Sequence, residues 1–531
     1  MNSPKERREG RVSPSGLNRR DLLALTVTGA MATATASVPY RVLAAVPQGQ
    51  LIWGVHISLA PTWFDPAETP GLITPFMVLY ALHDAMVKPM PAGPLTPSLA
   101  ESVSASEDGL AYDFVLRNGA TFHNGEPVTA EDVKFSFERY RGVSQSVMKA
   151  RISVIETPDP RRVSFKLKEP WPDFLTFYGA ATGAGWIVPK KYVEKVGEEG
   201  FKKAPIGAGP YKFVSFTPGV ELVLEAFDPH WRKTPSVKRL VFRVIQEETT
   251  RLAALKRGEV DIVYSIRGEL AEELQRTPGL TLKPVDSPAT FWLYFPEQWD
   301  EKSPWHDPRV RLAASLAIDR PSINQALTLG LSKLTGNASV PDFFDFYWSA
   351  PAPPYDPGKA RQLLAEAGYA QGFEAGDYYC DSSYSNLGEA VLDNLQAVGI
   401  RAKLRPLERV AFLEAYGKKS LKNIVQGGTG AFGNAATRLE ATAVKGGVYA
   451  YGSYPDIDQM FQDQAAQLDH KKRTAILQKM QQLVSERTMF APIWQLAFIN
   501  GAGPRVGESG FGLIPGFAYT GPYEDITIKG T

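Results

Sequence analysis

The chain has 531 residues, of which 44% are hydrophobic and 22% are charged, and its formal net charge is +1. These proportions are those of a globular protein, so they exclude a mostly disordered chain and a multi-span membrane protein. A charge so close to zero gives no electrostatic attraction for nucleic acid, and we expect no nucleic-acid partner. Cys380 is the only cysteine and the six histidines are widely spaced. The sequence therefore predicts no disulfide, no metal site and no cofactor.

Residues 1–45 have the order of an export signal. A polar, basic stretch ends in Arg19-Arg20, a mildly apolar stretch covers 22–38, and small residues follow. Paired arginines before a weakly apolar region resemble the twin-arginine export signal, although the residue before them is Asn where that signal usually has Ser or Thr. The apolar stretch is shorter than the ~20 residues that span a bilayer, and no cysteine ends it for a lipid anchor. We expect a mature protein that starts near Ala45 and is soluble in the periplasm, without a lipid anchor.

After this signal, short strands alternate with amphipathic helices. Apolar runs and alternations predict strands at 50–57, 112–117, 163–168, 220–226, 239–245, 261–264, 401–405 and 421–425. Thr129, with Asp132 three residues later, is close to a capping box and predicts the start of a helix. Further helices are expected at about 247–257, 308–318, 358–367, 384–398, 434–444 and 468–486. Strands that alternate with helices predict mixed α/β lobes.

Specific phrases recur along the chain from about residue 50 to residue 500. The longest, 116–138, is Leu-Arg-Asn-Gly-Ala-Thr-Phe-His-Asn-Gly-Glu-Pro-Val-Thr-Ala-Glu-Asp-Val-Lys-Phe-Ser-Phe-Glu, and shorter phrases begin at 95, 205, 228, 252, 307 and 355. Taken singly, most of them are turn and helix-end signals of a scaffold. Taken together and in this order, they resemble the family 5 extracytoplasmic solute-binding proteins, which are the oligopeptide-, dipeptide- and nickel-type receptors of ABC importers.

The resemblance implies a fold class and a domain organisation. The fold would be α/β, namely the two-lobed periplasmic binding protein fold (type II, large peptide-receptor class) with an extra subdomain in the first lobe. Lobe I would comprise residues 46–289 and 492–531, with the extra subdomain at about 70–185. Lobe II would comprise residues 290–491.

The same resemblance implies a function without catalysis. The protein would capture a small solute between its lobes and deliver it, as a monomer, to the permease and ATPase of an ABC importer in the inner membrane. Ligand binding would then shift the population from an open to a closed form.

Such a site needs aromatic walls and a few fixed polar anchors in a cleft between domains. Aromatic residues make up 11% of the chain. The candidates near segments that would face the cleft are Trp63, Phe64, Trp186, Trp292, Tyr294, Tyr449, Tyr451 and Trp494. For each of them, packing in a core is the alternative.

The stretch 425–440 contains the pattern Gly428-x-Gly430-x-x-Gly433 between an apolar run and an expected helix. A strand, these glycines and a helix are also the context of a dinucleotide-binding fingerprint, so the alternative function is an exported nucleotide-dependent oxidoreductase that uses loop 428–433. Against this alternative, no second strand that ends in an acidic residue follows, and no acid–base residues accompany the loop.

The resemblance gives this loop a different role. In peptide receptors of the family, the corresponding phrase resembles Gly-Trp-x-Ala-Asp-Tyr-x-x-Pro, and its aspartate holds the N-terminal ammonium of the peptide. Here threonine stands in the place of the tryptophan and phenylalanine in the place of the aspartate. The loop residues expected to contact a ligand are Thr429, Gly430, Ala431 and Phe432. We expect this ligand not to be an ordinary peptide held by its ammonium, unless Asp65 or Glu440 supplies the missing acid.

Overall fold

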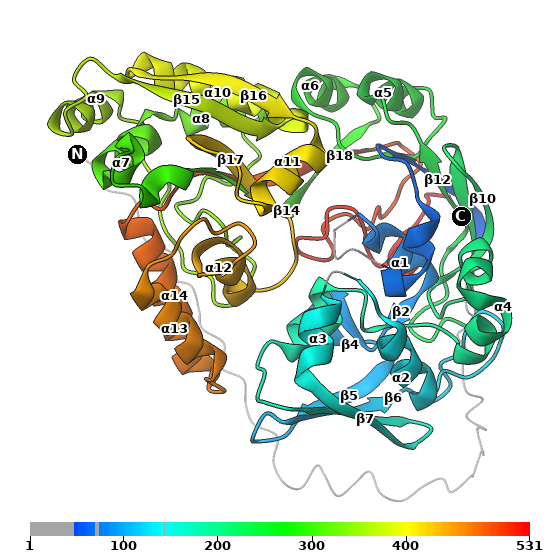
Figure 1. Ribbon diagram of the computed structural model, residues 1–531. Coiled ribbons are helices and arrows are strands. Elements are labelled where there is room, and N and C mark those ends of the chain that lie inside the picture. The colour runs from blue at the N-terminus through cyan, green and yellow to red at the C-terminus, as the bar shows by residue number, and fades with distance from the viewer. Residues whose placement is uncertain (1–46, 69–73, 143, 531) are drawn as a thin grey trace, which may run out of the picture. The chain divides into compact units, whose positions relative to one another are not determined.

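A ten-stranded sheet organises the chain, in the order β10-β11-β12-β1-β13-β18-β14-β17-β15-β16. Figure 1 shows β10 and β12 toward one side of the view and β15 and β16 toward the other. The structure is a computed structural model that describes residues 47–68, 74–142 and 144–530. The expected export signal therefore lies outside the described residues. Across these three ranges, no helix is both long enough and apolar enough to cross a membrane.

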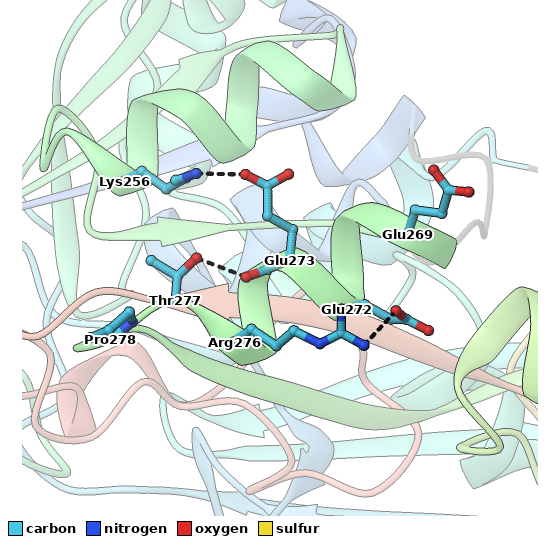
Figure 2. A pocket seen from close by; sticks show the side chains of 7 residues that line it. All are labelled: Lys256, Glu269, Glu272, Glu273, Arg276, Thr277 and Pro278. Carbon is cyan, nitrogen blue, oxygen red and sulfur yellow. Dashed lines mark hydrogen bonds and ion pairs between the residues drawn. The ribbon is translucent and has the colours of Figure 1, made fainter.

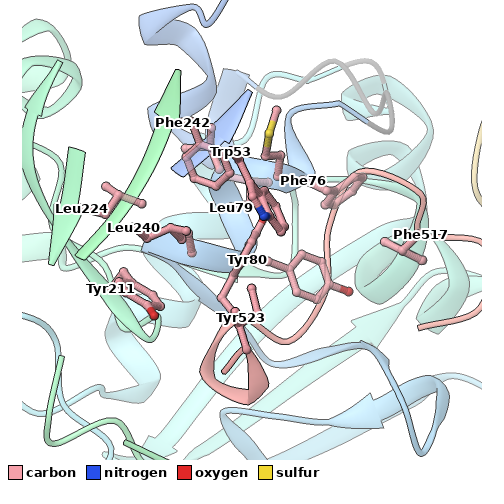
Figure 3. Close-up of a cluster of buried hydrophobic side chains, with 14 of the residues drawn as sticks. Trp53, Phe76, Leu79, Tyr80, Tyr211, Leu224, Leu240, Phe242, Phe517 and Tyr523 are labelled. Atoms are coloured by element: carbon pink, nitrogen blue, oxygen red, sulfur yellow. The ribbon is translucent and has the colours of Figure 1, made fainter. Parts of the chain in front are cut away.

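The first half of the sheet is parallel at its centre. Its strands are β10 (Tyr211–Thr217), β11 (Glu221–Ala226), β12 (Val237–Val244), β1 (Gln48–Val55) and β13 (Ile262–Val263). Strand β1 runs parallel to both β12 and β13, and β10 and β11 extend the edge as an antiparallel pair. Helix α1 (Phe76–Leu82), α5 (Glu248–Lys256) and α6 (Gly268–Arg276) belong to this half, and every residue of α1 is buried. Helix α1 packs into an aromatic core with Trp53, Phe76, Tyr80, Phe242, Phe517 and Tyr523 among its members (Figure 3), whereas the buried side chains of α5 and α6 form a separate cluster.

The second half of the sheet is formed by β17 (Ile424–Thr429), β15 (Phe373–Asp381) and β16 (Ile400–Leu407), in which β15 is parallel to both neighbours. The helices that follow along the chain in this half are α7 (Pro308–Ala317), α8 (Arg320–Thr328), α9 (Pro357–Glu366), α10 (Ser385–Ala397), α11 (Arg409–Gly417), α12 (Ala435–Ala443), α13 (Pro455–Ala465) and α14 (His470–Glu486). The side chains of this half form two buried clusters of their own.

Two long strands connect the halves. β14 (Thr281–Tyr294) and β18 (Phe490–Ala502) are antiparallel partners, and their register shifts between Asp286 and Thr290. After the shift β14 also pairs with β17, while the end of β18 pairs with β13. The lobe boundaries expected at 289/290 and 491/492 fall within these two strands, and they stay a prediction.

A third sheet region lies in the segment expected to form the extra subdomain. Its four strands are β5 (Ala100–Ala105), β6 (Ala111–Leu116), β8 (Arg162–Leu167) and β7 (Ile152–Asp159), in that order. Two further pairs are β2 (Asp84–Ala85) with β9 (Trp186–Ile187), and β3 (Val87–Met90) with β4 (Gly93–Pro97). Its helices are α2 (Ala130–Arg139) and α3 (Gln145–Arg151), and α4 (Lys190–Lys203) follows just after the expected end of the subdomain. The predicted capping box of α2 is confirmed, because Thr129 and Asp132 exchange both of its hydrogen bonds.

Candidate functional site

The glycine pattern lies at the end of β17, where aromatic rings of the neighbouring strand require it. A Cβ on Gly427 would lie 2.5 Å from Nε1 of Trp292, and a Cβ on Gly428 would lie 3.1 Å from the ring of Phe291. Both rings belong to β14, which pairs antiparallel with β17. Side chains at 427 and 428 would therefore displace these rings, and the glycines are explained without a nucleotide.

The helix after the loop has its N-terminus closed by protein groups. The Asn434 side chain accepts a hydrogen bond from the Thr437 N–H at 3.1 Å and donates one to Asp173 Oδ1 at 2.5 Å. A Cβ on Gly433 would overlap the Thr437 hydroxyl, so this glycine makes room for the cap. The helix end that would receive a pyrophosphate in a dinucleotide-binding protein is thus already capped.

A buried guanidinium fixes the shape of the loop. Arg438 is 2% exposed and donates to the carbonyl oxygens of Thr429 at 2.9 Å, Ala431 at 2.6 Å and Pro288 at 2.7 Å. Burial lowers the pKa of the Arg438 guanidinium to about 9, and Tyr449 offsets part of that effect. These bonds hold the loop to the strand β14, close to one of the expected lobe boundaries.

Phe432 extends from the loop into the aromatic core of the first half of the sheet. Its ring stacks on Phe517, with centroids 3.8 Å apart, and meets Phe76 edge-on at 5.8 Å. Thr429 and Gly430 are half-buried and Ala431 is exposed. Under the predicted boundaries, the loop of lobe II therefore contacts lobe I through Phe432.

A polar cluster lies where the same two lobes meet. The rings of His56 and Tyr519 stack at 5.4 Å. Burial, and then the nearby Tyr384, raise the pKa of the Tyr519 hydroxyl, while Arg409 and Arg267 act in the opposite direction. These five side chains, which we call the polar cluster, come from five separate segments of the chain.

Both arginines of the polar cluster have protein partners, and those of Arg267 lie on both sides of the predicted boundary. Arg267 Nη1 donates to the Ser383 carbonyl at 3.5 Å, across the expected boundary, and its Nε lies 4.0 Å from Glu248. Arg409 Nη1 donates to Asp381 Oδ2 at 2.8 Å. A groove of about 390 Å³ opens beside Arg267, and Glu248 lines it from one side and Ser383 from the other. The groove thus lies at the junction of the expected lobes.

His56 is the histidine of the polar cluster. Burial, together with Arg251 and Arg267, lowers its pKa to about 3, so its imidazole is neutral at pH 7. Within the described residues its Nδ1 has no hydrogen-bond partner. The residue directly follows β1, and ligands of α/β proteins bind at the carboxyl ends of strands. That position is the signal by which the sequence could have identified it.

A second hollow, of about 640 Å³, lies over helix α6 and has a different character (Figure 2). Two ion pairs lie in it, Lys256 with Glu273 at 2.5 Å and Arg276 with Glu272 at 3.0 Å, and Glu269 lines it as well. It is an open helix face with surface ion pairs, and we do not assign a site to it.

The structure separates the predicted aromatic contacts into two groups. Those buried in hydrophobic cores are Phe64, Trp186, Trp292, Tyr294 and Trp494. Those that are half-buried are Trp63, Tyr449 and Tyr451. Tyr449 is electrostatically coupled to Arg409 of the polar cluster and to Arg438, whereas Trp186 packs against Phe76 and Tyr80. Their roles as ligand contacts stay predictions.

Two acidic residues were the expected substitutes for the missing aspartate. Asp65 is fully buried and accepts two hydrogen bonds from Arg139, each at 2.7 Å, so its charge is already compensated. Glu440 lies at an exposed position of α12 and is electrostatically coupled to Arg151 and Asp173. The partners of both residues thus lie outside the polar cluster. Among the described residues, no group of acidic, histidine or cysteine side chains has the arrangement of a metal site.

Comparison with known proteins identifies the family. The model of the bacterial extracellular solute-binding proteins, family 5, middle region, matches residues 94–449. The chain belongs to this family. Its relatives include the probable di/tripeptide-binding protein 5 of Pseudomonas aeruginosa UCBPP-PA14, which is 26% identical over 85% of this chain and 91% of that protein. The glutathione-binding protein GsiB of Salmonella choleraesuis is 26% identical over 81% and 86% of the two chains.

Solved structures share the fold. The periplasmic binding protein AgaA of A. tumefacien R10, determined in complex with agropinic acid, has a TM-score of 0.72 at 26% identity and covers 91% of this chain and 99% of its own. The expected two-lobed α/β fold of the peptide-receptor class is confirmed, and this family 5 protein is a substrate-binding protein of the ABC importer family. Its relatives are binding proteins, and the oxidoreductase alternative finds no support. Gly428 packs against the Phe291 ring and Gly433 makes room for the helix cap.

Proposed function

We propose that this protein is exported to the periplasm, binds a small acidic solute between its lobes, and passes it as a monomer to the permease and ATPase of an inner-membrane importer. One observation supports the acidic ligand: Arg267 and Arg409, from opposite sides of the predicted boundary at 289/290, both bond to the segment 381–383, Arg267 to the Ser383 carbonyl oxygen at 3.5 Å and Arg409 to Asp381 Oδ2 at 2.8 Å. A carboxylate between them would receive charge-assisted hydrogen bonds from both lobes. It would therefore stabilise the closed form relative to the open one.

The charge around the polar cluster favours an anion. Arg251 lies close enough to lower the pKa of His56, and it donates its hydrogen bonds to backbone carbonyl oxygens. Arg438 is bonded in the same way. The described residues give neither of these guanidiniums a carboxylate as ion-pair partner. An acidic ligand would thus enter a region whose positive charge is only partly compensated.

The same region is unfavourable for a peptide ammonium. The position that resembles the aspartate of peptide receptors is Phe432, whose ring is buried against Phe517, and Asp65 is already paired with Arg139. An ammonium buried without a carboxylate costs about 3–5 kcal/mol. Among the ligands in the relatives' names, agropinic acid therefore fits better than a di- or tripeptide held by its N-terminus.

The experiment begins with native mass spectrometry of the mature chain as purified, which would reveal a retained solute. Titration calorimetry then compares agropinic acid, glutathione, a free dipeptide, its N-acetyl form and its C-terminal amide. We expect that N-acetylation leaves the affinity unchanged and that amidation abolishes binding. Submicromolar binding of the free dipeptide that is lost on N-acetylation would overturn the proposal.

Export by the twin-arginine route is tested separately. Replacing Arg19 and Arg20 by Lys should retain the protein in the cytoplasm, because the paired arginines are the feature that this route reads. Fractionation of the host cells, with a Sec-exported reporter as control, measures the outcome. Unchanged periplasmic accumulation of the double variant would contradict this route.

A further inference from the structure

A second contact between the predicted lobes lies at Asp173, in a turn just before η3 (Thr176–Ala181) of the extra subdomain. Asp173 is 8% exposed. Its Oδ1 accepts a hydrogen bond from Asn434 Nδ2 at 2.5 Å, and its Oδ2 forms an ion pair with Arg473 of α14. Both partners belong to the predicted lobe II, so one carboxylate of lobe I holds two separate segments of the other lobe.

The surroundings show a packed contact rather than an isolated ion pair. A Cβ on Gly109 would lie 2.9 Å from Leu468 Cδ2 and 3.4 Å from Pro170 Cβ, so Leu468 of lobe II packs against lobe I beside Asp173. Arg473 is held by its own lobe, because its Nε donates to Gln464 Oε1 at 2.9 Å and its guanidinium lies 4.8 Å from the Phe346 ring. The guanidinium is therefore preorganised to meet the carboxylate.

Asn434 connects this contact to the glycine loop. It is the N-cap of α12 and comes two residues after Phe432. Its Oδ1 accepts from the Thr437 N–H while its Nδ2 donates to Asp173, so both ends of the amide are fixed. The start of α12, and with it the end of the loop, is thus held from the opposite lobe.

We propose that Asp173 is a positioning residue: it sets the loop 429–432 through Asn434 and, with Arg473, latches the lobes in the closed form. The proposal rests on the proposed function, in which two lobes close on a solute. Opening returns Asp173, Asn434 and Arg473 to water. In the closed form, removal of the carboxylate leaves Arg473 without its counter-ion and the Asn434 amide without its acceptor.

The test measures lobe separation directly. Spin labels are placed on Glu107→Cys and Lys471→Cys, which are exposed positions on the two sides of the contact, while Cys380 is buried and escapes labelling. Pulsed electron paramagnetic resonance on the full mature protein then gives the distance distribution. We expect Asp173→Asn to lower the ratio of the short-distance to the long-distance population at least tenfold, and Arg473→Gln to do the same.

Asp65→Asn is the matched control. Asp65 is also a buried aspartate paired with an arginine, but its partner Arg139 lies in the same predicted lobe. We expect this variant to lower the melting temperature and to leave the distance distribution unchanged. The double variant Asp173→Asn/Arg473→Gln should be no more open than either single variant, because all three break the same contact.

The distance distribution tests the proposal whether or not the solute is known. A wild-type distance distribution in Asp173→Asn overturns the proposal, and if that variant does not fold, wild-type distributions in Asn434→Ala and Arg473→Gln overturn it instead. With agropinic acid as probe, the latch predicts a higher dissociation rate and an unchanged association rate for Asp173→Asn. Failure of every probe to bind would contradict the proposed function alone, because the distance measurement uses no ligand.

Discussion

Phe432 stacks on Phe517 with ring centroids 3.8 Å apart and an interplanar angle of 11°. The two residues come from different predicted lobes, and both rings are almost fully buried. The position that would hold an aspartate in peptide receptors therefore carries an aromatic ring that packs across the lobe boundary. Under the predicted boundaries, this contact joins the glycine loop of lobe II to the aromatic core of lobe I.

The stacking predicts a specific coupling. Phe432→Ala and Phe517→Ala should each cost about 3–5 kcal/mol of unfolding free energy, as buried aromatic truncations do. The double variant should show a coupling of about 0.5–1.5 kcal/mol, because each single variant already removes the shared contact. Urea unfolding of the four proteins measures this cycle. Phe242→Ala, in the same core but not in contact with Phe432, is the control and should combine additively.

Gly427 should tolerate no side chain, because a Cβ there would lie 2.5 Å from Trp292 Nε1 and 3.0 Å from the Tyr416 hydroxyl. Gly427→Ala is expected to lose about 1–3 kcal/mol through overpacking. Gly417→Ala is the matched control, since no atom lies within 4 Å of its Cβ position. Chemical denaturation compares them, and equal stabilities would show that packing does not require the glycine at 427.

Local elements followed from the sequence because their signals are local. The helix expected at 468–486 is α14 (His470–Glu486), and the capping box at Thr129 is present. The strand expected at 421–425 instead extends over Ile424–Thr429 as β17. Gly427 and Gly428 continue strand β17 and lie against the rings of Trp292 and Phe291. This contact follows from the pairing of β17 with β14, which the local sequence does not contain.

The polar cluster was not predicted as a set, because its members lie far apart in the sequence and are brought together by the fold. Four of them nevertheless share a signal: each lies within a few residues of the carboxyl end of a parallel strand. His56 follows β1, Arg267 follows β13, Tyr384 follows β15 and Arg409 follows β16. Ligands of α/β proteins bind at the carboxyl ends of strands. The ligand contacts predicted from the sequence were chosen by their aromatic character instead, and several of them, such as Trp494, are buried in cores.

The arginines of the polar cluster should govern affinity for acidic probes. Arg267→Gln and Arg409→Gln are each expected to weaken binding of agropinic acid at least tenfold, since each removes a charge-assisted hydrogen bond of roughly 1.5–3 kcal/mol. Arg401→Gln is the control, because Arg401 is exposed and pairs with Glu374 at the sheet edge. Calorimetry measures the three affinities. Equal loss in all three variants would indicate a general charge effect rather than direct contact.

Arg438 should be irreplaceable by lysine, although lysine keeps the charge. The guanidinium serves three carbonyl oxygens from Thr429, Ala431 and Pro288 at once, and an ammonium on a flexible stem does not reproduce that fork. Each carbonyl left unsatisfied costs about 1–3 kcal/mol. Arg438→Lys is therefore expected to lower stability and to speed hydrogen exchange in residues 429–433. A wild-type rate of hydrogen exchange in that loop would contradict the inference that Arg438 holds the loop in place.

Three histidines with lowered pKa values predict that stability falls on mild acidification. Burial is the main cause that lowers the pKa of His83 to about 4, and of His56 and His123 to about 3, from an ordinary value of 6.5. Because the folded pKa lies below the unfolded one, the unfolded chain binds more protons between pH 6.5 and pH 4. Unfolding free energy should then decrease as pH falls through this window, by up to about 1.4 kcal/mol per pH unit for each histidine.

The measurement is urea unfolding at intervals from pH 7.5 to pH 5, above the range in which most carboxylates titrate. His83 is the residue to replace, because it is fully buried and its Nε2 lies 2.9 Å from the Phe64 carbonyl oxygen, a contact that the amide of glutamine would keep. Between pH 6.5 and pH 5, His83→Gln should reduce the slope of unfolding free energy against pH by the contribution of one histidine. A slope unchanged by the substitution would mean that the burial of His83 does not contribute to acid sensitivity.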